Sequence, residues 1–275
     1  MTAGDRDTVM LSVVVPVYNE RATVEDLLYR VQAVEIPKEI LVVDDCSTDG
    51  TREFLADLRQ STGRGVRFML PRLEKPLATE NIRIFFQGRN LGKGAALRRG
   101  FAASRGEIVV VQDADLEYDP QDYHALIVPI LRGVADVVYG SRFLGGPHRV
   151  LFFWHYVGNK MMTLLSNMVT NLNLSDLWTC YKVFRRDALR RLILREDRFG
   201  IEQELTIKVA RLGLRIYEVP ISYYGRTYAE GKKITWRDGL RGIWCIVRYG
   251  LLGGQASAPA SAAPYEERVA ETVRR

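Results

Sequence analysis

The chain of 275 residues contains only three cysteines and three histidines. Cys46, Cys180 and Cys245 are far apart and form no C-x-x-C pair, which argues against a disulfide framework or a structural zinc site and favours a reducing, cytoplasmic setting. The sequence also lacks a run of 18 apolar residues and a basic flank before its first apolar run. We therefore expect neither a membrane-spanning helix nor a secretory signal, and a protein that is soluble or lies on a membrane surface.

Charge is nearly balanced, with 39 Lys and Arg against 33 Asp and Glu and a net charge of +6. This small excess suits an acidic ligand or an anionic membrane, and it is too weak to indicate nucleic acid.

Hydrophobic residues make up 47% of the chain, enough for a buried core. We expect one folded domain over residues 1–253. Residues 254–275, rich in Ala, Ser and Pro and then charged, are expected to form a disordered tail.

Short apolar runs alternate with amphipathic stretches along the chain, which predicts an α/β fold with a mostly parallel sheet flanked by helices. Strands separated by helices of this length require right-handed crossover connections. The predicted strands are 11–17, 39–44, 82–86, 107–112, 135–139 and 215–219. The predicted helices are a segment around 54–58 and residues 24–34, 94–104, 150–170, 202–212 and 238–252.

Acidic residues follow two of the predicted strands. Asp44 and Asp45 end the second strand, and Asp113 and Asp115 follow the fourth, with Glu117 two residues later. Ligands of open parallel sheets bind at the carboxyl ends of the strands. In extended backbone, residues 113, 115 and 117 would point the same way and offer oxygen ligands to Mg²⁺ or Mn²⁺. The alternative is that these acids are solvated or cap a helix that starts near Pro120. No P-loop or Rossmann glycine fingerprint accompanies them.

Six motifs occur in a fixed order across residues 12–249, and together they resemble those of glycosyltransferase family 2, which has the GT-A fold. Within that family the chain is most similar to the polyprenyl (dolichyl) phosphate mannose and glucose synthases. The motifs span residues 15–20, 42–50, 90–95, 113–115, 139–142 and 226–232. The resemblance implies a nucleotide-binding half at about 10–140 and an acceptor half at about 141–253.

The resemblance also implies roles for individual residues. The expected nucleotide-sugar ligands are Pro16, Tyr18, Glu20, Val43, Asp45, Asp113, Ala114 and Arg142. The expected metal ligands are Asp113, Asp115 and Glu117. The expected ligands of an acceptor phosphate are Arg142, Arg149 and Lys182, although Lys182 stands where these enzymes often have Arg. Arg226 and Lys232 match cations of a loop that closes over the donor.

The chemistry of a sugar nucleotide requires stabilisation of a nucleoside diphosphate leaving group. A metal on Asp115, with Arg226 and Lys232, would supply this stabilisation. The acceptor would attack C1 from the face opposite the leaving group, which inverts the configuration at C1. A lipid phosphate acceptor is already anionic and needs no base, whereas a hydroxyl acceptor needs a carboxylate base. Glu202 matches the base of the hydroxyl-acceptor enzymes and Glu204 a residue of the lipid-phosphate enzymes. The two diverge on a helix, so we expect only one to face the site.

The sequence therefore predicts a metal-dependent, inverting transferase that moves a hexose from GDP-mannose or UDP-glucose to polyprenyl phosphate. Basic residues beside the aromatic segment 150–157, and the mixed basic and apolar helix 238–252, suit contact with the inner face of the membrane, alone or through a membrane partner protein. The alternative is that these helices pack on the sheet, which the sequence supports at least as well for helix 238–252. One alternative is a transferase of the same fold that acts on a sugar or glycan hydroxyl. Another is a non-catalytic nucleotide-sugar binder.

Overall fold

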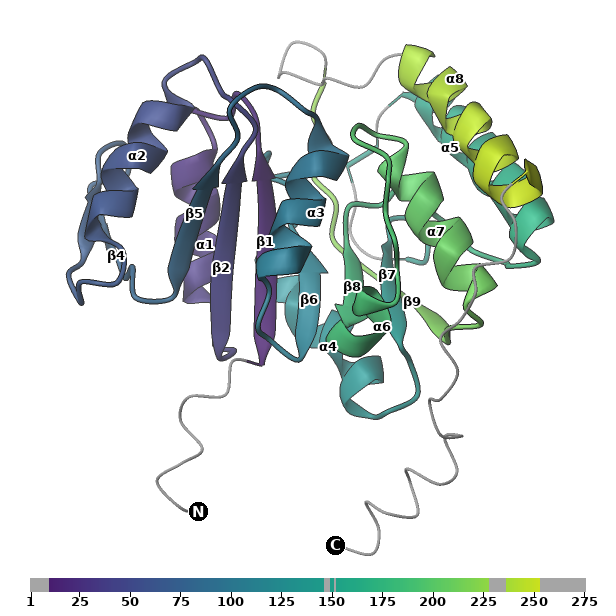
Figure 1. The fold of residues 1–275 in the computed structure, drawn as a ribbon, viewed down its shortest axis with the longest axis horizontal. Helices are drawn as coiled ribbons and strands as arrows, with labels where there is room; N and C mark the ends of the chain where they lie inside the picture. The colour runs from purple at the N-terminus through teal and green to yellow at the C-terminus, as the bar shows by residue number, and fades with distance from the viewer. Residues whose placement is uncertain (1–9, 146–148, 151, 228–235, 253–275) are drawn as a thin grey trace, which may run out of the picture.

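A seven-stranded sheet forms the centre of the computed structural model, which describes residues 10–145, 149–150, 152–227 and 236–252 (Figure 1). The strand order is β5-β2-β1-β6-β8-β7-β9, and β8 is antiparallel to both of its neighbours while the other pairs are parallel. The strands are β1 (Leu11–Val17), β2 (Lys38–Asp44), β5 (Ile82–Phe86), β6 (Ile108–Val111), β7 (Val137–Ser141), β8 (Lys182–Arg185) and β9 (Ile216–Pro220). The α/β prediction is confirmed. The predicted tail lies outside the described residues.

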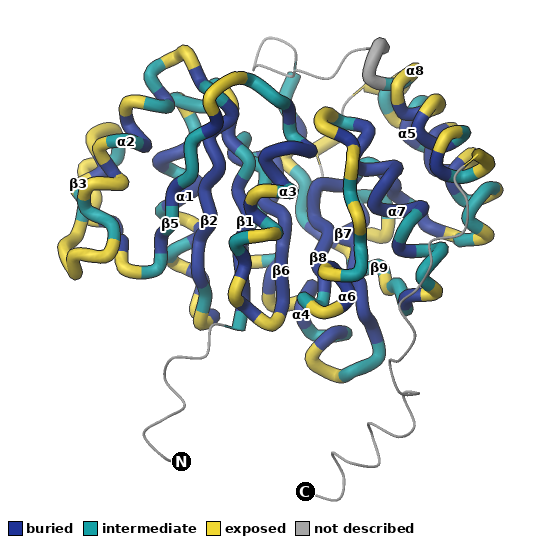
Figure 2. The backbone as a smooth tube through the Cα atoms, in the orientation of Figure 1, coloured by how far each residue is buried: buried dark blue, intermediate teal, exposed yellow. Residues whose placement is uncertain are grey.

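The central strands are buried on both faces, which explains their continuous apolar sequences (Figure 2). In β1, Leu11, Val13, Val14 and Val15 are fully buried. Parallel pairing of β1 with β2 and β6 brings the carboxyl ends of all three strands to one edge of the sheet. That edge is where the predicted acidic residues gather.

Helices cover both faces of the first half of the sheet. α1 (Val24–Ala33) lies behind the sheet and α3 (Lys93–Ala103) in front of it in Figure 1. Opposite faces follow from right-handed crossovers, because the chain moves outward from β1 to β2 and returns from β5 to β6. The remaining elements are α2 (Thr51–Ser61), η1 (Pro120–Asp122), α4 (Tyr123–Leu131) and a hairpin of β3 (Phe68–Leu70) and β4 (Lys75–Leu77) that the sequence analysis did not predict.

The second half adds a layer of helices beside the sheet. It contains α5 (Phe153–Thr170), α6 (Arg186–Arg190), α7 (Ile201–Arg211), α8 (Trp236–Cys245) and a π-helix, η2 (Ile246–Leu252). The predicted single helix 238–252 is therefore an α-helix continued by a π-helix. A small second core joins these helices, formed by Met162, Leu177, Ile207, Cys245, Ile246 and Tyr249. None of the helices within the described ranges is long and apolar enough to span a bilayer.

Candidate active site

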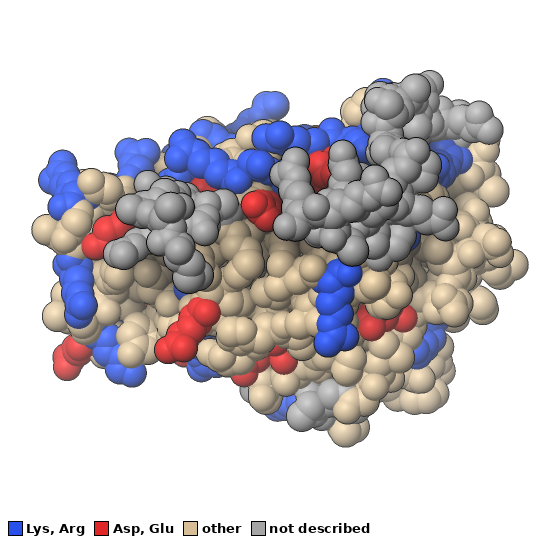
Figure 3. Space-filling view, turned by 90° about the horizontal axis from the view of Figure 1, so that it is seen from below, with Lys and Arg blue, Asp and Glu red and all other residues tan. Residues whose placement is uncertain are grey.

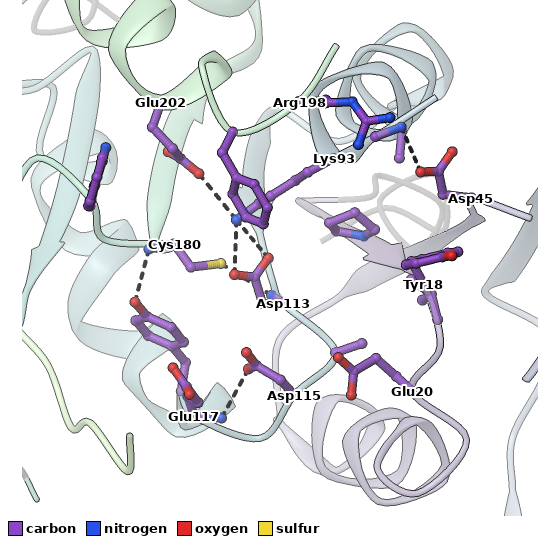
Figure 4. Close-up of a pocket in the computed structure, with 18 of the residues that line it drawn as sticks. Tyr18, Glu20, Asp45, Lys93, Asp113, Asp115, Glu117, Cys180, Arg198 and Glu202 are labelled. Carbon is purple, nitrogen blue, oxygen red and sulfur yellow. Dashed lines mark hydrogen bonds and ion pairs between the residues drawn. The ribbon is translucent and has the colours of Figure 1, made fainter. Parts of the chain in front are cut away.

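A cavity of about 550 Å³ opens at the carboxyl ends of β1, β2 and β6 (Figure 4). Its volume is within the range of small-molecule sites. Its described lining includes six carboxylates, Glu20, Asp45, Asp113, Asp115, Glu117 and Glu202. The lining also includes four cations, Lys93, Arg142, Arg198 and Arg226. Negative charge is therefore in excess inside a protein of net positive charge.

The segment 113–117 forms a turn after β6, and the expectation of extended backbone there is wrong. Leu116 has a φ of 62°, in the left-handed region, and the backbone N–H of Glu117 donates to the Asp115 carboxylate at 3.2 Å. The turn sends the three carboxylates to different partners. Asp113 faces Lys93, whereas Asp115 and Glu117 face Arg226.

Arg226, which follows β9, reaches across the cavity to three acidic side chains. Its guanidinium nitrogens lie 3.0 Å from Asp115, 3.4 Å from Glu117 and 3.5 Å from Glu20. Its backbone N–H also donates to Glu117 at 3.0 Å, and the Tyr223 hydroxyl donates to the other Glu117 oxygen at 2.9 Å. Arg226 is therefore the principal counter-charge of this acidic turn.

Burial, together with the nearby charges of Asp113 and Glu117, raises the pKa of Asp115 to about 7, against the opposing effect of Arg226. Crowded carboxylate oxygens of this kind have the chemistry of a site for a hard divalent cation. Within the described part of the chain, however, no three His, Cys, Asp or Glu side chains are already arranged around a common metal position. The predicted ligands fit Mg²⁺ or Mn²⁺ by donor type, and their side chains are at present turned toward Lys93 and Arg226.

Lys93 and Lys182 hold Glu202 from two sides. The Lys93 ammonium lies 2.9 Å from Asp113 and 3.1 Å from Glu202, and Lys182 pairs with the second Glu202 oxygen. Burial would raise the pKa of Glu202, but Lys182 and then Lys93 outweigh burial and leave it below its ordinary value. Lys93 lies in the motif at 90–95, yet the sequence analysis assigned it no role.

Two predicted site residues point away from the cavity. Glu204 is fully buried, its carboxylate accepts hydrogen bonds from the backbone N–H groups of Arg195 and Glu196, and it pairs with Lys208. Lys182 is 1% exposed, and its ammonium also donates to the carbonyl oxygens of Leu177 and Thr179. Neither lines the cavity, so the structure does not support Glu204 as a catalytic group or Lys182 as a phosphate ligand. Of the two glutamates, Glu202 faces the site.

The other end of the cavity contains the residues expected to hold the nucleoside. Pro16, Tyr18 and Ala114 line it, as does Asp45, whereas Val43 is fully buried within β2 and does not. The Asp45 carboxylate accepts hydrogen bonds from the backbone N–H groups of Leu91 and Gly92, at 2.8 and 2.7 Å, and therefore fixes the loop that leads into α3. Three further lining residues, which the sequence analysis did not identify, are Trp178, Arg198 and Phe199.

Arg142 lines the cavity and is fixed by a two-pronged ion pair with buried Asp176, at 2.7 and 2.8 Å. Asp176 keeps a pKa below its ordinary value, because Arg142 and other donors outweigh the effect of burial. Arg149 is exposed, does not line the cavity, and donates to the carbonyl oxygen of Gly225. Lys232 lies outside the described residues.

An acidic, cation-bridged cavity at the carboxyl edge of an α/β sheet has the place and the charge of a binding site for a charged ligand. The family model described as glycosyl transferase family 2 matches residues 12–193, and the chain belongs to that family of glycosyltransferases. It is 30% identical to a Micrococcus luteus protein named undecaprenyl-phosphate mannosyltransferase, over 80% of this chain and 85% of that protein.

Two further comparisons concern a second relative and the fold. An Aeromonas hydrophila protein named undecaprenyl-phosphate 4-deoxy-4-formamido-L-arabinose transferase is 26% identical over 83% of this chain and 64% of its own length. Glucosyl-3-phosphoglycerate synthase from Mycobacterium tuberculosis, solved with Mn²⁺, UDP and phosphoglyceric acid, has the same fold. Its TM-score is 0.63 at 22% identity, with 92% of this chain and 80% of that chain covered. The same enzyme has been solved with Mg²⁺ and UDP.

Proposed function

We propose that the chain transfers a hexose from a nucleotide sugar to polyprenyl phosphate, with the aid of Mg²⁺ or Mn²⁺ and with inversion at C1. The observation that carries this proposal is the pairing of Glu202 with Lys93 and Lys182. A carboxylate between two ammonium groups takes up a proton poorly and is a weak general base for a hydroxyl acceptor.

A phosphate acceptor removes the need for a base. The second pKa of a phosphate monoester is about 6, so the acceptor is an anionic nucleophile at neutral pH. One acceptor oxygen attacks C1, the bond from C1 to the diphosphate oxygen breaks, and the nucleoside diphosphate leaves with the electron pair. The names of the Micrococcus luteus and Aeromonas hydrophila relatives, which both specify undecaprenyl phosphate, support this acceptor class.

The residues of the cavity divide this work between them. Asp113, Asp115 and Glu117 would hold the divalent cation, which when bound supplies Lewis-acid stabilisation of the diphosphate leaving group. Arg226 adds positive charge beside these carboxylates, and Lys232, which lies outside the described residues, stays a sequence-based candidate for the same role. Arg142, held in one orientation by Asp176, would bind a donor or acceptor phosphate through its remaining N–H donors.

An exposed apolar surface supports access to a lipid acceptor. The outer side of α5 and the adjoining α8 and η2 present large apolar side chains, which we call the apolar face. Its members are Phe153, Trp154, Tyr156, Met161, Leu164, Met168, Leu240, Ile243, Trp244, Leu251 and Leu252. In Figure 3 few charged side chains appear at the right-hand end, which carries α5 in Figure 1. With Lys160, Arg241 and Arg248 nearby in sequence, we propose that this face lies on the inner surface of an anionic membrane, directly or with a membrane partner.

The proposal is tested by incubating the full chain with labelled GDP-mannose or UDP-glucose, a short polyprenyl phosphate, and Mg²⁺ or Mn²⁺. We expect label in the organic phase with one of the two donors, and none after chelation of the metal. Metal-dependent donor hydrolysis without lipid product would favour a hydroxyl acceptor. Nucleotide binding without any turnover would favour the non-catalytic binder.

A further inference from the structure

Arg226 neutralises the same carboxylates that the proposed metal needs. Its guanidinium contacts Asp115, Glu117 and Glu20, and its backbone N–H holds Glu117 as well. A divalent cation that bound Asp115 and Glu117 would therefore compete with Arg226 for their oxygens. Two of the other cavity cations are engaged elsewhere, since Lys93 bridges Asp113 and Glu202 while Arg142 is paired with Asp176.

We propose that Arg226 exchanges partners when substrate binds: it neutralises the acidic turn in the free protein and transfers to the donor diphosphate when metal and nucleotide occupy the site. This inference rests on the proposed function and adds an energetic coupling to it. Metal alone must displace Arg226 from Asp115 and Glu117, which leaves it the longer contact with Glu20. When metal and nucleotide bind together, the metal again displaces Arg226 from the carboxylates, but the two phosphates of the nucleotide become its new partners. Each of the two ligands therefore favours binding of the other.

Geometry supports the exchange. Arg226 is anchored to the acidic turn by single-pronged contacts of 3.0 to 3.5 Å, whereas Arg142 holds Asp176 by two parallel contacts of 2.7 and 2.8 Å. Two-pronged pairs with aligned donors are the stronger kind. The partners differ in burial as well, since the Asp115 side chain is 17% exposed whereas the Asp176 side chain is fully buried. Of Arg226 and Arg142, Arg226 is thus the one that changes partners at the lower cost in free energy.

The test is the affinity of the full chain for Mn²⁺, measured by electron paramagnetic resonance of free Mn²⁺ at constant ionic strength. It compares the wild type with Arg226→Gln, without nucleotide and with UDP or GDP. Arg198→Gln is the matched control, because it removes another cavity arginine that is near Asp45 and has no recorded ion pair with the acidic turn.

We expect Arg226→Gln to bind Mn²⁺ alone about tenfold more tightly than the wild type, since the competing cation is gone. Without nucleotide, Arg198→Gln should match the wild type within about twofold. Nucleotide should strengthen Mn²⁺ binding by a larger factor in the wild type than in Arg226→Gln. A different result would overturn the exchange but leave the proposed function standing. In that result the wild type binds Mn²⁺ in the presence of nucleotide, and Arg226→Gln binds Mn²⁺ alone no more tightly than the wild type does. If no variant binds Mn²⁺ with either nucleotide, both proposals fail.

Discussion

Lys182 and Glu202 form an ion pair inside the protein, between β8 and the first turn of α7. The ammonium of Lys182 has no other acidic partner in the described structure, and its other hydrogen bonds go to the carbonyl oxygens of Leu177 and Thr179. The side chain expected to bind phosphate thus neutralises the side chain that matches the base of the hydroxyl-acceptor enzymes. This pairing is the physical reason why we favour an acceptor that needs no base.

A double-mutant cycle of stability tests the pairing. Lys182→Met and Glu202→Gln should each lower the free energy of unfolding by about 3 kcal/mol, because each leaves a buried charge or donor without its partner. The double variant should recover at least about 1 kcal/mol relative to the sum of the two losses. Urea unfolding measures both quantities. The exposed ion pair of Arg30 and Asp26 is the control, and substitutions there should lower the free energy of unfolding by less than about 1 kcal/mol. Losses at positions 182 and 202 that simply add in the double variant would contradict the pairing.

Asp115→Asn tests the acidic turn. The substitution keeps the size of the side chain but removes one negative charge from the proposed metal ligands. We expect metal-dependent transfer to fall at least about 100-fold, since stabilisation of the leaving group depends on the cation. Asp119→Asn is the control, because its carboxylate accepts a hydrogen bond from the Gln121 N–H and an amide oxygen can do the same. Retention of most activity in Asp115→Asn would exclude the proposed metal site.

Gly94→Ala tests how closely α3 approaches the 194–200 loop. A Cβ at Gly94 would lie 2.2 Å from the carbonyl oxygen of Glu196, so the loop must move. We expect a loss of about 1–3 kcal/mol in stability despite the better helix propensity of alanine. The KM for the donor should rise, because the loop positions Arg198 and Phe199 in the cavity. Gly88→Ala, where a Cβ meets no atom within 4 Å, should change stability by less than about 0.5 kcal/mol.

Substitutions in the apolar face test membrane contact. Phe153 and Trp154 are 65% and 77% exposed, so serine at either position should leave folding intact. Insertion of such side chains into the lipid boundary contributes about 1.5–3 kcal/mol each, so we expect each variant to bind anionic vesicles about tenfold more weakly in a flotation assay. Met69→Ser is the control, because Met69 is 59% exposed on the distant β3 hairpin. Equal vesicle binding by all variants would rule out this face.

Much of the fold was predictable because its central strands are continuous apolar runs. The strands at 11–17 and 82–86 were predicted with the bounds that the structure has. β8 was missed because it begins with Lys182, a charged residue whose buried ammonium is paired with Glu202, 20 residues away in the sequence. The hairpin of β3 and β4 was missed because each strand has three residues and shows no periodicity.

The residues of the candidate site were predictable where they directly follow a strand, and less so where loops distant in the sequence contribute them. Asp45, Asp113 and Asp115 lie at the sheet edge as expected. Trp178 and Arg198 enter the cavity from loops whose approach depends on tertiary packing, which spacing in the sequence does not encode. In the predicted helix 238–252, Tyr249 follows the alternative of internal packing, because it is buried and its hydroxyl donates to Glu196.

The most direct test of the central claim compares two acceptors that differ in a single group. Short polyprenyl phosphate and the matching polyprenol are incubated with the full chain, metal and the preferred donor. We predict transfer to the phosphate and none to the alcohol, because Glu202 is held by two ammonium groups and is a weak base. Transfer to the alcohol, lost in Glu202→Gln, would contradict the account and make Glu202 the catalytic base.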